Sequence, residues 1–310
     1  TANALANALT SRYSLGNVEL VDINNMRTKH KKLTFTKMRG TGNDYLYFDC
    51  FDQTVESPES LAVRLSNRRT GVGSDGIVLI MPSTIADAKM RMFNADGTEG
   101  SVAGNALRCV CKYLYENGHV RKDEMAVETG SGVKTAKLFI REDQVFSVLV
   151  DMGCPAFAPA KIPVKLDGDR VMMRPVFLAG EKREISCVSM GNPHVVIFVE
   201  DVNRIPLEQV GPQIETDSLF PERVNVSFAQ IVDKNDIVMR VWERGIGETA
   251  ACGTGACAVA VAAVENGFCT RGADIDVRLP GGTLVVRYQE DGKVWLTGDA
   301  NTDFTGTIEI

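Results

Sequence analysis

Glu248-Thr-Ala-Ala-Cys252-Gly253-Thr254-Gly-Ala-Cys257 follows the same plan as the earlier stretch Glu99-Gly-Ser-Val-Ala103-Gly104-Asn105-Ala-Leu-Arg-Cys109. In each, a Glu lies four residues before a small residue, which is followed by Gly, by an amide or hydroxyl side chain, and by an apolar run. Both runs end in Glu-Asn-Gly, and the copies are 149 residues apart, as are Gly42-Asn43 and Gly191-Asn192. Three matches at one offset predict a duplicated domain with equivalent sites facing each other.

The bulk properties are those of an ordinary globular protein. A chain of 310 residues is long enough for two domains, each with its own core. The net charge of −6 and the pI of about 5.3 argue against general affinity for nucleic acid, and we interpret the basic run 29–32 as a solvated segment. No apolar stretch approaches the length of a membrane span, so we expect no membrane association.

The first residues and the cysteines indicate a reducing compartment. Residues 1–32 read as an N-terminal extension without the basic and apolar regions of a signal peptide, and we exclude them from the fold. The eight cysteines contain no Cys-x-x-Cys pair and the three histidines are scattered, so we expect no metal site. Free thiols in a chain of this size predict a cytoplasmic protein.

The hydrophobic pattern predicts an α+β fold. We expect helices at Pro58–Arg69 with Ser57 as N-cap, at Ala106–Asn117, near 206–214 and at Gly255–Asn266. Because Gly255–Val264 is apolar on all sides, it should be a core helix. Alternating or continuous apolar runs predict strands at 33–38, 45–49, 76–81, 88–93, 125–128, 133–140, 145–150, 185–190, 194–199, 224–230, 236–242, 274–279, 283–289, 293–297 and 305–310.

These elements divide into two similar halves. Residues 33–150 form the first predicted domain and residues 151–297 the second, with the last segment, 298–310, returning to the first. Each domain is expected to be a mostly antiparallel sheet wrapped around one long buried helix. The two domains should be pseudo-symmetric, with the active site in the cleft between them.

Cys252 carries the chemistry in this interpretation. It precedes a helix, where free backbone N–H groups and the helix dipole favour negative charge. We therefore expect a lowered pKa for its thiol, and Cys252 to be the most reactive of the eight cysteines. The same N–H groups could hold the carboxylate of a small acid beside the sulfur. The alternative is a core cysteine at a tight turn.

A second motif at the same position points elsewhere. Gly253-Thr-Gly255-Ala-Cys-Ala258 matches the GxGxxA fingerprint of dinucleotide-binding folds. The preceding strand is expected to end near Trp242, which leaves a long insertion before the glycines, and the partner copy Gly104-Asn-Ala106 lacks the second glycine. We therefore favour the interpretation as an acid-binding helix start.

Five ordered motifs make the chain resemble the diaminopimelate epimerase family over residues 33–310. They are Gly40-Thr-Gly-Asn43-Asp44-Tyr, Asn94-Ala-Asp-Gly-Thr-Glu99, Gly104-Asn105-Ala-Leu-Arg-Cys, Met190-Gly-Asn192-Pro-His194 and Trp242-Glu243-Arg244-Gly-Ile-Gly-Glu-Thr-Ala-Ala-Cys252-Gly-Thr-Gly-Ala-Cys. The resemblance implies an isomerase that works without pyridoxal phosphate or any other cofactor. One cysteine, as thiolate, removes the α-proton of the amino acid, and a second thiol delivers a proton to the opposite face.

The resemblance also assigns roles to residues. Cys252 matches the thiol of the second domain, and His194 and Glu243 would poise the thiols. The amino and carboxylate groups at the reacting carbon would be held by Gly104, Asn105, Gly253, Thr254, Glu243 and Arg244. The distal end of the substrate would lie among Asn43, Asn94, Asn192, Asn225 and Arg244.

The sequence departs from the family at two positions. Ala106 replaces a common glycine, and Ala103 stands where the family has its first-domain catalytic cysteine. A methyl group cannot carry a proton, and Cys109 is well over one helical turn away, so it should face elsewhere. Ala103 is either an engineered substitution, which we favour because the binding residues persist, or the mark of a natural homologue that lost the reaction.

The sequence thus predicts the scaffold of an enzyme that interconverts LL- and meso-diaminopimelate in the formation of lysine and peptidoglycan precursors, here inactive or impaired at position 103. One alternative is a racemase of another amino acid on the same scaffold. Another is a non-catalytic amino-acid-binding protein. The expected partner is the small-molecule substrate, diaminopimelate, and a homodimer is left open.

Overall fold

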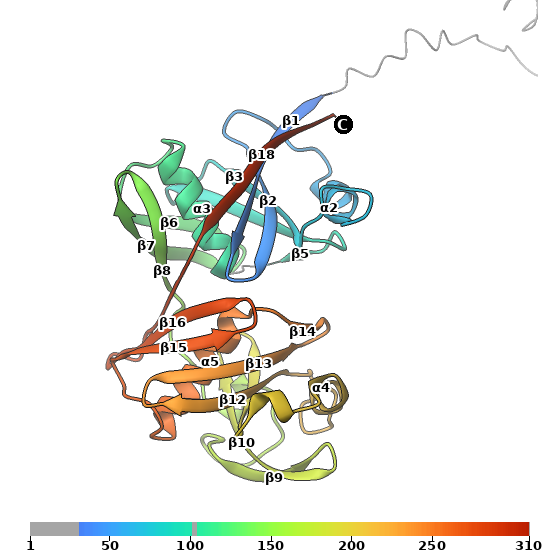
Figure 1. Ribbon diagram of the computed structural model, residues 1–310, viewed down its shortest axis with the longest axis vertical. Coiled ribbons are helices and arrows are strands. Elements are labelled where there is room, and N and C mark those ends of the chain that lie inside the picture. Colours follow the sequence, from blue (N-terminus) through green and yellow to red (C-terminus); the bar gives the residue numbers. More distant parts are fainter. Residues whose placement is uncertain (1–30, 101–103, 310) are drawn as a thin grey trace, which may run out of the picture. The chain divides into compact units, whose positions relative to one another are not determined.

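The computed structural model describes residues 31–100 and 104–309, which contain four α-helices, two short 3₁₀ helices and eighteen strands (Figure 1). Contacts within the chain separate a small unit, residues 1–34 with 307–310, from a large unit, Phe35–Gly306. The described part of the small unit is the outer ends of two strands, joined by an ion pair of 3.7 Å between Lys32 and Glu309. The large unit holds every feature discussed below. Most of the expected N-terminal extension, and Ala103, lie outside the described residues.

The strands of the first half follow the expected segments closely. One strand of two residues, β5, was not expected. The strands are β1 (Lys32–Gly40), β2 (Asn43–Asp49), β3 (Gly76–Met81), β4 (Ala88–Asn94), β5 (Glu99–Gly100), β6 (Glu124–Thr129), β7 (Gly132–Arg141) and β8 (Gln144–Asp151).

The second half adds two strands that the sequence pattern did not indicate, β9 and β14. Its strands are β9 (Arg174–Leu178), β10 (Glu181–Ser189), β11 (Pro193–Phe198), β12 (Asn225–Asp233), β13 (Asp236–Glu243), β14 (Gly247–Thr249), β15 (Asp274–Leu279), β16 (Gly282–Tyr288) and β17 (Val294–Gly298). The final strand, β18 (Asn301–Glu309), pairs with β1.

Strand pairing repeats between the halves. In the first, β2 runs parallel to β3, β4 pairs antiparallel with β3 and β5 and parallel with β6, and β6, β7 and β8 form an antiparallel meander. In the second, β11, β12, β13, β14, β15, β16 and β17 repeat this order of partners and directions. An antiparallel pairing of β8 with β17 connects the two sets of strands. The internal repeat seen in the sequence is therefore a repeat of topology.

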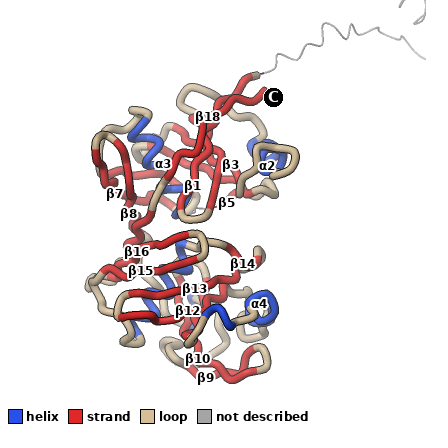
Figure 2. The backbone as a smooth tube through the Cα atoms, in the orientation of Figure 1, coloured by secondary structure: helices blue, strands red, loops and turns tan. Residues whose placement is uncertain are grey.

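A buried helix occupies the centre of each half (Figure 2). These helices, α3 (Gly104–Glu116) and α5 (Gly253–Glu265), have equal lengths and keep the 149-residue offset. Every residue of α5 from Gly255 to Ala263 is buried, which confirms the prediction of a core helix. Both helices begin two residues earlier than expected.

The other two helices are short. Helix α2 (Pro58–Ser66) ends three residues before its expected end, where Asn67 turns to extended backbone. Ser57 is at the expected N-cap position, but its backbone is left-handed, with φ of 48°, and its side chain makes no capping hydrogen bond. Helix α4 (Leu207–Glu215) lies close to its predicted range and packs on the face of the second sheet that points away from α5.

Helix α4 also anchors the end of β13. The buried carboxylate of Glu215 accepts hydrogen bonds from the indole N–H of Trp242 at 2.7 Å and from the backbone N–H of Gly245 at 2.8 Å. The ring of Trp242 lies directly against Gly211 of α4, where an added Cβ would come within 2.7 Å of two ring atoms. The position of the Trp242 ring therefore requires a residue without a side chain at position 211.

A histidine is fully buried inside the second half. His194 lies on β11, where its Nε2 faces Asn192 Oδ1 at 3.0 Å, and its Nδ1 has no partner among residues 31–100 and 104–309. Because an amide oxygen only accepts, Nε2 carries the proton and the ring is neutral. Burial, followed by the positive charge of Arg244, lowers the pKa of His194 to about 3.

Substitution Gly211→Ala should destabilise the fold although alanine favours helices. The new methyl group would displace Trp242, and overpacking of this kind costs roughly 1–3 kcal/mol. Gln209→Ala, at an exposed position of the same helix, is the matched control and should have little effect. Unfolding in urea measures both, and a Gly211→Ala protein as stable as the control would contradict the packing described here.

His194 should make the fold sensitive to acid. Between pH 6.5 and 3 the unfolded chain binds a proton at this ring and the folded chain does not, so stability falls as the pH falls through this window. The contribution approaches about 1.4 kcal/mol per pH unit. Unfolding free energies at several pH values should show a shallower loss for His194→Gln than for the parent, and parallel curves would exclude this origin.

Candidate active site

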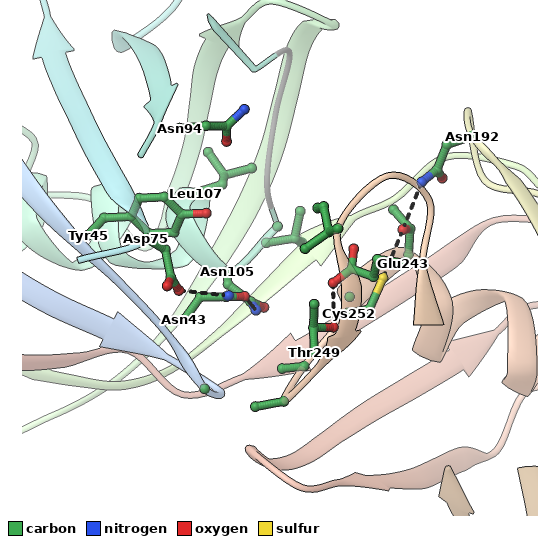
Figure 3. Close-up of a pocket in the computed structure, with 18 of the residues that line it drawn as sticks. Asn43, Tyr45, Asp75, Asn94, Asn105, Leu107, Asn192, Glu243, Thr249 and Cys252 are labelled. Atoms are coloured by element: carbon green, nitrogen blue, oxygen red, sulfur yellow. Dashed lines mark hydrogen bonds between the residues drawn. The ribbon is translucent and has the colours of Figure 1, made fainter. Parts of the chain in front are cut away.

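A cavity of about 1120 Å³ is lined by residues from both halves of the large unit (Figure 3). The first half contributes side chains from β2, from the end of β4 and from the first turn of α3, and the second half contributes the end of β13, the loop before α5 and its first turn. The start of α3 and the start of α5 thus both open into this cavity, as the repeated sequence predicted. The predicted site residues that line it are Asn43, Asn94, Gly104, Asn105, Asn192, Glu243, Cys252, Gly253 and Thr254.

Cys252 is the N-cap of α5. Its Sγ accepts a hydrogen bond from the N–H of Gly255 at 3.3 Å and lies 3.6 Å from the hydroxyl of Thr254. The thiol is nonetheless not acidified, because burial raises its pKa strongly and the carboxylate of Glu243 raises it further, against the smaller opposing effects of Thr254 and Gly255. The expectation of a lowered pKa is therefore wrong for this arrangement, since the helix amides are outweighed by the loss of solvent.

The expected reactivity order of the cysteines changes accordingly. Cys252 is 5% exposed, whereas Cys154 is a free and exposed thiol. A bulky alkylating reagent should thus reach Cys154 before Cys252, contrary to what the position of Cys252 at a helix start suggested. Reactivity toward a molecule held inside the cavity is a separate matter, because such a molecule is already beside the sulfur.

Glu243 stands next to the thiol. It is the last residue of β13, and its Oε1 accepts a hydrogen bond of 2.6 Å from the hydroxyl of Thr249. Burial raises the pKa of Glu243, while hydrogen bonds with Thr249 and Cys252 partly oppose the rise. A carboxylate hydrogen-bonded to a thiol is a base for its proton. Thr249 was missed at the sequence level, although Gly245-Ile-Gly247 is the type of turn that brings a strand such as β14 back onto β13.

Asn105, in the first turn of α3, donates from its Nδ2 to Asn43 Oδ1 at 2.7 Å. Its own Oδ1 faces α5, because a Cβ placed on Gly253 would lie 3.8 Å from that oxygen. Asn192 donates to the hydroxyl of Thr254 at 3.3 Å, and so connects β11 to the first turn of α5. These contacts bring the amide side chains of the two halves to one place.

Three predicted site residues do not line the cavity. His194 lies behind Asn192, as described above. Asn225 donates to Pro193 O at 2.8 Å and accepts from the backbone N–H of Arg244 at 2.9 Å, so its side chain holds backbone. The guanidinium of Arg244 donates to Glu222 O at 3.1 Å. The roles that the resemblance gives to Asn225 and Arg244 in contacting a substrate stay predictions.

Several lining residues were not singled out from the sequence, among them Tyr45, Arg68 and Asp75. Nothing in a single sequence marks a tyrosine on a strand or an aspartate before one as a cavity residue. Among residues 31–100 and 104–309, no group of three His, Cys, Asp or Glu side chains is arranged to hold a metal ion. In the same part of the chain, no helix is both long and apolar enough to cross a membrane.

Comparison with known sequences identifies the family. The family model for diaminopimelate epimerase matches residues 35–158 and 186–302. The diaminopimelate epimerase of Desulfovibrio desulfuricans is 50% identical over 285 residues, which cover 90% of this chain and 99% of that protein. That of Acetivibrio thermocellus is 48% identical over 279 residues, with coverage of 90% and 99%.

Solved structures establish the fold independently. A phenazine biosynthesis protein of the PhzF family from Bacillus anthracis aligns with a TM-score of 0.66 at 18% identity, covering 90% of this chain and 100% of its own. A hydroxyproline epimerase from Agrobacterium vitis, with bound trans-4-OH-L-proline, aligns with a TM-score of 0.61 at 16% identity, covering 92% and 94%. These matches confirm the α+β class with mostly antiparallel strands. The repeated topology and the sequence matches together lead to one conclusion: the chain belongs to the diaminopimelate epimerase family.

Proposed function

We propose that this protein is a diaminopimelate epimerase scaffold, which acts at one α-carbon of diaminopimelate by proton transfer and is impaired by Ala103. The observation that carries the proposal is the position of Cys252. Its sulfur lies at the start of α5, beside the carboxylate of Glu243, in a cavity that also receives the start of α3. The relatives that match nearly the full length of their own chains bear the name of this activity.

The two helix starts suit the carboxylate at the reacting carbon. The first backbone N–H groups of a helix have no partner within it, and the dipoles of α3 and α5 both favour an anion where they meet. Gly104 and Asn105 would offer such groups from one side, and Gly253 and Thr254 from the other. A carboxylate held there leaves the attached carbon close to the Cys252 sulfur.

The proton would then move in two steps. Glu243 takes the proton of the Cys252 thiol, and the resulting thiolate removes the α-proton of the amino acid, leaving a carbanion stabilised by its carboxylate. Inversion requires an acid on the opposite face. In this chain the family's second acid is replaced by the methyl group of Ala103, so the proton can return only from the side it left. His194 acts indirectly in this scheme, because its ring touches Asn192 and not the cavity.

The distal end of the substrate distinguishes the candidate ligands. Asn94 and Asn192 line the cavity and would face a polar distal group, which suits a diamino diacid. Asn43, which the resemblance also assigns to the distal end, lines the cavity with its amide bonded to Asp75 and Asn105. The alternatives are racemisation of another amino acid and binding without chemistry. Calorimetry with LL- and meso-diaminopimelate against lysine, histidine and proline separates them, because the proposal requires diaminopimelate to bind most tightly.

Three further parts of the proposal concern the whole molecule. We place the boundary between the two domains near residues 150 and 151, with the last strand returning to the first domain. We place the protein in the cytoplasm, where the reducing environment would keep its cysteines free. Light scattering would show whether a homodimer forms in solution.

The variant Ala103→Cys should gain epimerase activity. One positioned acid is worth about 10²–10⁴-fold in rate, so the parent chain should be slower than the variant by at least that factor. Circular dichroism of the amino acid follows inversion directly, and calorimetry should show that both proteins bind diaminopimelate. Ala103→Ser, with a much weaker acid at the same place, is the matched control. Equal turnover by the parent and Ala103→Cys would contradict the assignment.

The parent chain should exchange the α-proton with solvent without inverting the centre. In heavy water, Cys252 would remove a proton and return a deuteron to the same face, for one configuration only. In this mechanism Glu243 takes the thiol proton, so exchange requires the ionised carboxylate of Glu243. Burial raises the pKa of Glu243, so the rate should rise as the pH passes through that pKa and then level off. Mass spectrometry of the recovered amino acid measures the rate.

Two variants test the cause of this pH dependence. Cys252→Ser should abolish exchange, and exchange that survives this change would exclude Cys252 as the base. Glu243→Gln removes this internal base, so the thiol must lose its proton to solvent. Because burial still raises the pKa of Cys252, exchange should become slower at neutral pH and should climb with pH by up to about tenfold per unit. A Glu243→Gln protein that exchanges at the parent rate near neutral pH would contradict the described pairing.

A further inference from the structure

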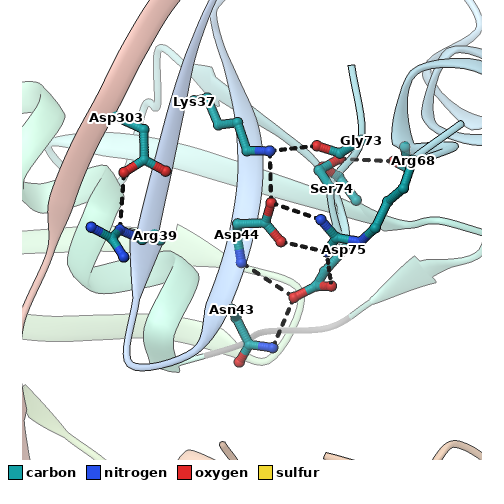
Figure 4. A network of polar contacts seen from close by, with 11 residues as sticks. Lys37, Arg39, Asn43, Asp44, Arg68, Gly73, Ser74, Asp75 and Asp303 are labelled. Carbon is teal, nitrogen blue, oxygen red and sulfur yellow. Dashed lines mark hydrogen bonds and ion pairs between the residues drawn. The ribbon is translucent and has the colours of Figure 1, made fainter. Parts of the chain in front are cut away.

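A series of hydrogen-bonded polar side chains leads from the rim of the cavity to the first turn of α3 (Figures 3 and 4). Arg68, just beyond α2, donates from Nη2 to Asp75 Oδ1 at 2.9 Å, and Asp75 Oδ2 accepts from Asn43 Nδ2 at 3.0 Å. Asn43 Oδ1 in turn accepts from Asn105 Nδ2 at 2.7 Å. The four side chains come from separate segments of the first half, so folding must bring them together.

Charged groups hold the outer end of this series of side chains. Besides Asp75, Arg68 binds both carboxylate oxygens of Asp44, at 2.6 and 3.2 Å, and Lys37 binds Asp44 Oδ2 at 2.8 Å. The backbone N–H of Asp44 also donates to Asp75 Oδ2 at 3.2 Å. The Asp75 carboxylate therefore accepts from three separate donors and has one well-defined position.

This carboxylate decides which way the two amides face. A side-chain amide can turn its oxygen or its nitrogen toward a neighbour, but an ionised carboxylate only accepts. Asn43 must therefore direct its nitrogen toward Asp75, which leaves its oxygen for Asn105. Asn105 must then direct its nitrogen toward Asn43, which leaves its oxygen at the inner end of this series of side chains.

The inner end is an acceptor without a donor. Asn105 is 4% exposed, and its Oδ1 is buried with no hydrogen-bond partner among the residues that the structure describes. It faces the start of α5 at Gly253. A buried acceptor left unpaired is costly, so this oxygen is suited to a donor that a bound molecule brings into the cavity.

We propose that Asp75, held by Arg68, is a positioning residue that fixes the direction of the Asn43–Asn105 amide pair and so presents an acceptor to the α-ammonium group of the substrate. This inference rests on the proposed function. The carboxylate of an amino acid would bind the N–H groups of the two helix starts, and its ammonium group is bonded to the same α-carbon as that carboxylate. A hydrogen-bond acceptor beside the anion site attracts the ammonium group and repels a carboxylate that binds in the wrong orientation. The cavity would thus select 2-amino acids over the same acids without the amine.

The test compares two ligands that differ only in their amines. Calorimetry gives the dissociation constants of meso-diaminopimelate and of pimelate, the seven-carbon diacid without ammonium groups. The ratio of the two constants is the ammonium preference, and effects on the carboxylate sites cancel in it. Asp75→Ala should lower this ratio roughly tenfold, since a hydrogen bond to a charged group is lost when the amides are free to turn.

Two further variants separate direction from structure. Asp96→Ala removes a different carboxylate that lines the cavity, one that accepts hydrogen bonds from Thr98 of its own turn, and should leave the ratio within about twofold. Adding Asn105→Asp to Asp75→Ala moves the carboxylate to the inner end, where it can only accept. Asn43 would then donate to residue 105, and the ammonium preference should return.

Each outcome is decisive. A loss with Asp75→Ala that the second change restores supports the inference, because a merely loosened loop would not be repaired by a charge at position 105. An unchanged ratio in Asp75→Ala, or a ratio that the added Asn105→Asp fails to restore, overturns it while leaving the proposed function intact. If the parent chain shows no preference for diaminopimelate over pimelate, both fail, and the calorimetry with other amino acids tells which ligand replaces it.

Discussion

The starts of two buried helices open into one cavity, and the rest of the structure is arranged around that constraint. A helix start carries backbone N–H groups that the helix itself cannot satisfy. At α5 the Cys252 sulfur caps the N–H of Gly255, and both helices are packed in the cores of their halves, so the cavity is where the other N–H groups can meet a partner. Duplicating the same strand–helix unit sets two such starts against each other. The fold therefore produces a small site rich in donors, to which a carboxylate is the natural complement.

Within that site, the thiol shows how two rules about cysteine compete. A helix start lowers the pKa of a nearby thiol, and burial raises it. At Cys252 the Gly255 N–H supplies the first effect, but desolvation and the adjacent carboxylate of Glu243 supply a larger second one. The sulfur is thus stored as a thiol with a base beside it. In the proposed mechanism, activation by a local carboxylate has an advantage over a permanently lowered pKa, because a protonated, shielded thiol is protected from oxidants and alkylating agents in solution.

The sequence was informative where its patterns are set by local physics. The 149-residue offset located both helices and the cavity, and the apolar composition of Gly255–Val264 identified a core helix. It was less informative where tertiary contacts decide. Ser57 takes the N-cap position that its residue type predicts, but its backbone is left-handed and its side chain does not cap the helix. The contacts that Asn225 and Arg244 make with backbone atoms depend on the tertiary fold in the same way.

Arg108 shows this limit most clearly. An arginine in a helix usually faces water, but this one is fully buried, with Nε donating to Asp299 O and Nη2 to the hydroxyl of Thr41. It connects α3 to two loops that are 67 and 191 residues away. No periodicity in the sequence indicates such partners, because they depend on loops from both ends of the chain meeting at one place.

The two halves contribute different kinds of side chain to the cavity. The second half supplies Cys252, Glu243 and Thr249, which contact one another through hydrogen bonds. The first half supplies amides whose direction is fixed by polar contacts that begin at the rim. Under the proposed function, the helix N–H groups and the amides would bind the amino acid, whereas its inversion would need one acid on each face of the α-carbon. A chain with Ala103 would then keep recognition and lose inversion, so that ligand binding and catalysis could be measured separately in this protein.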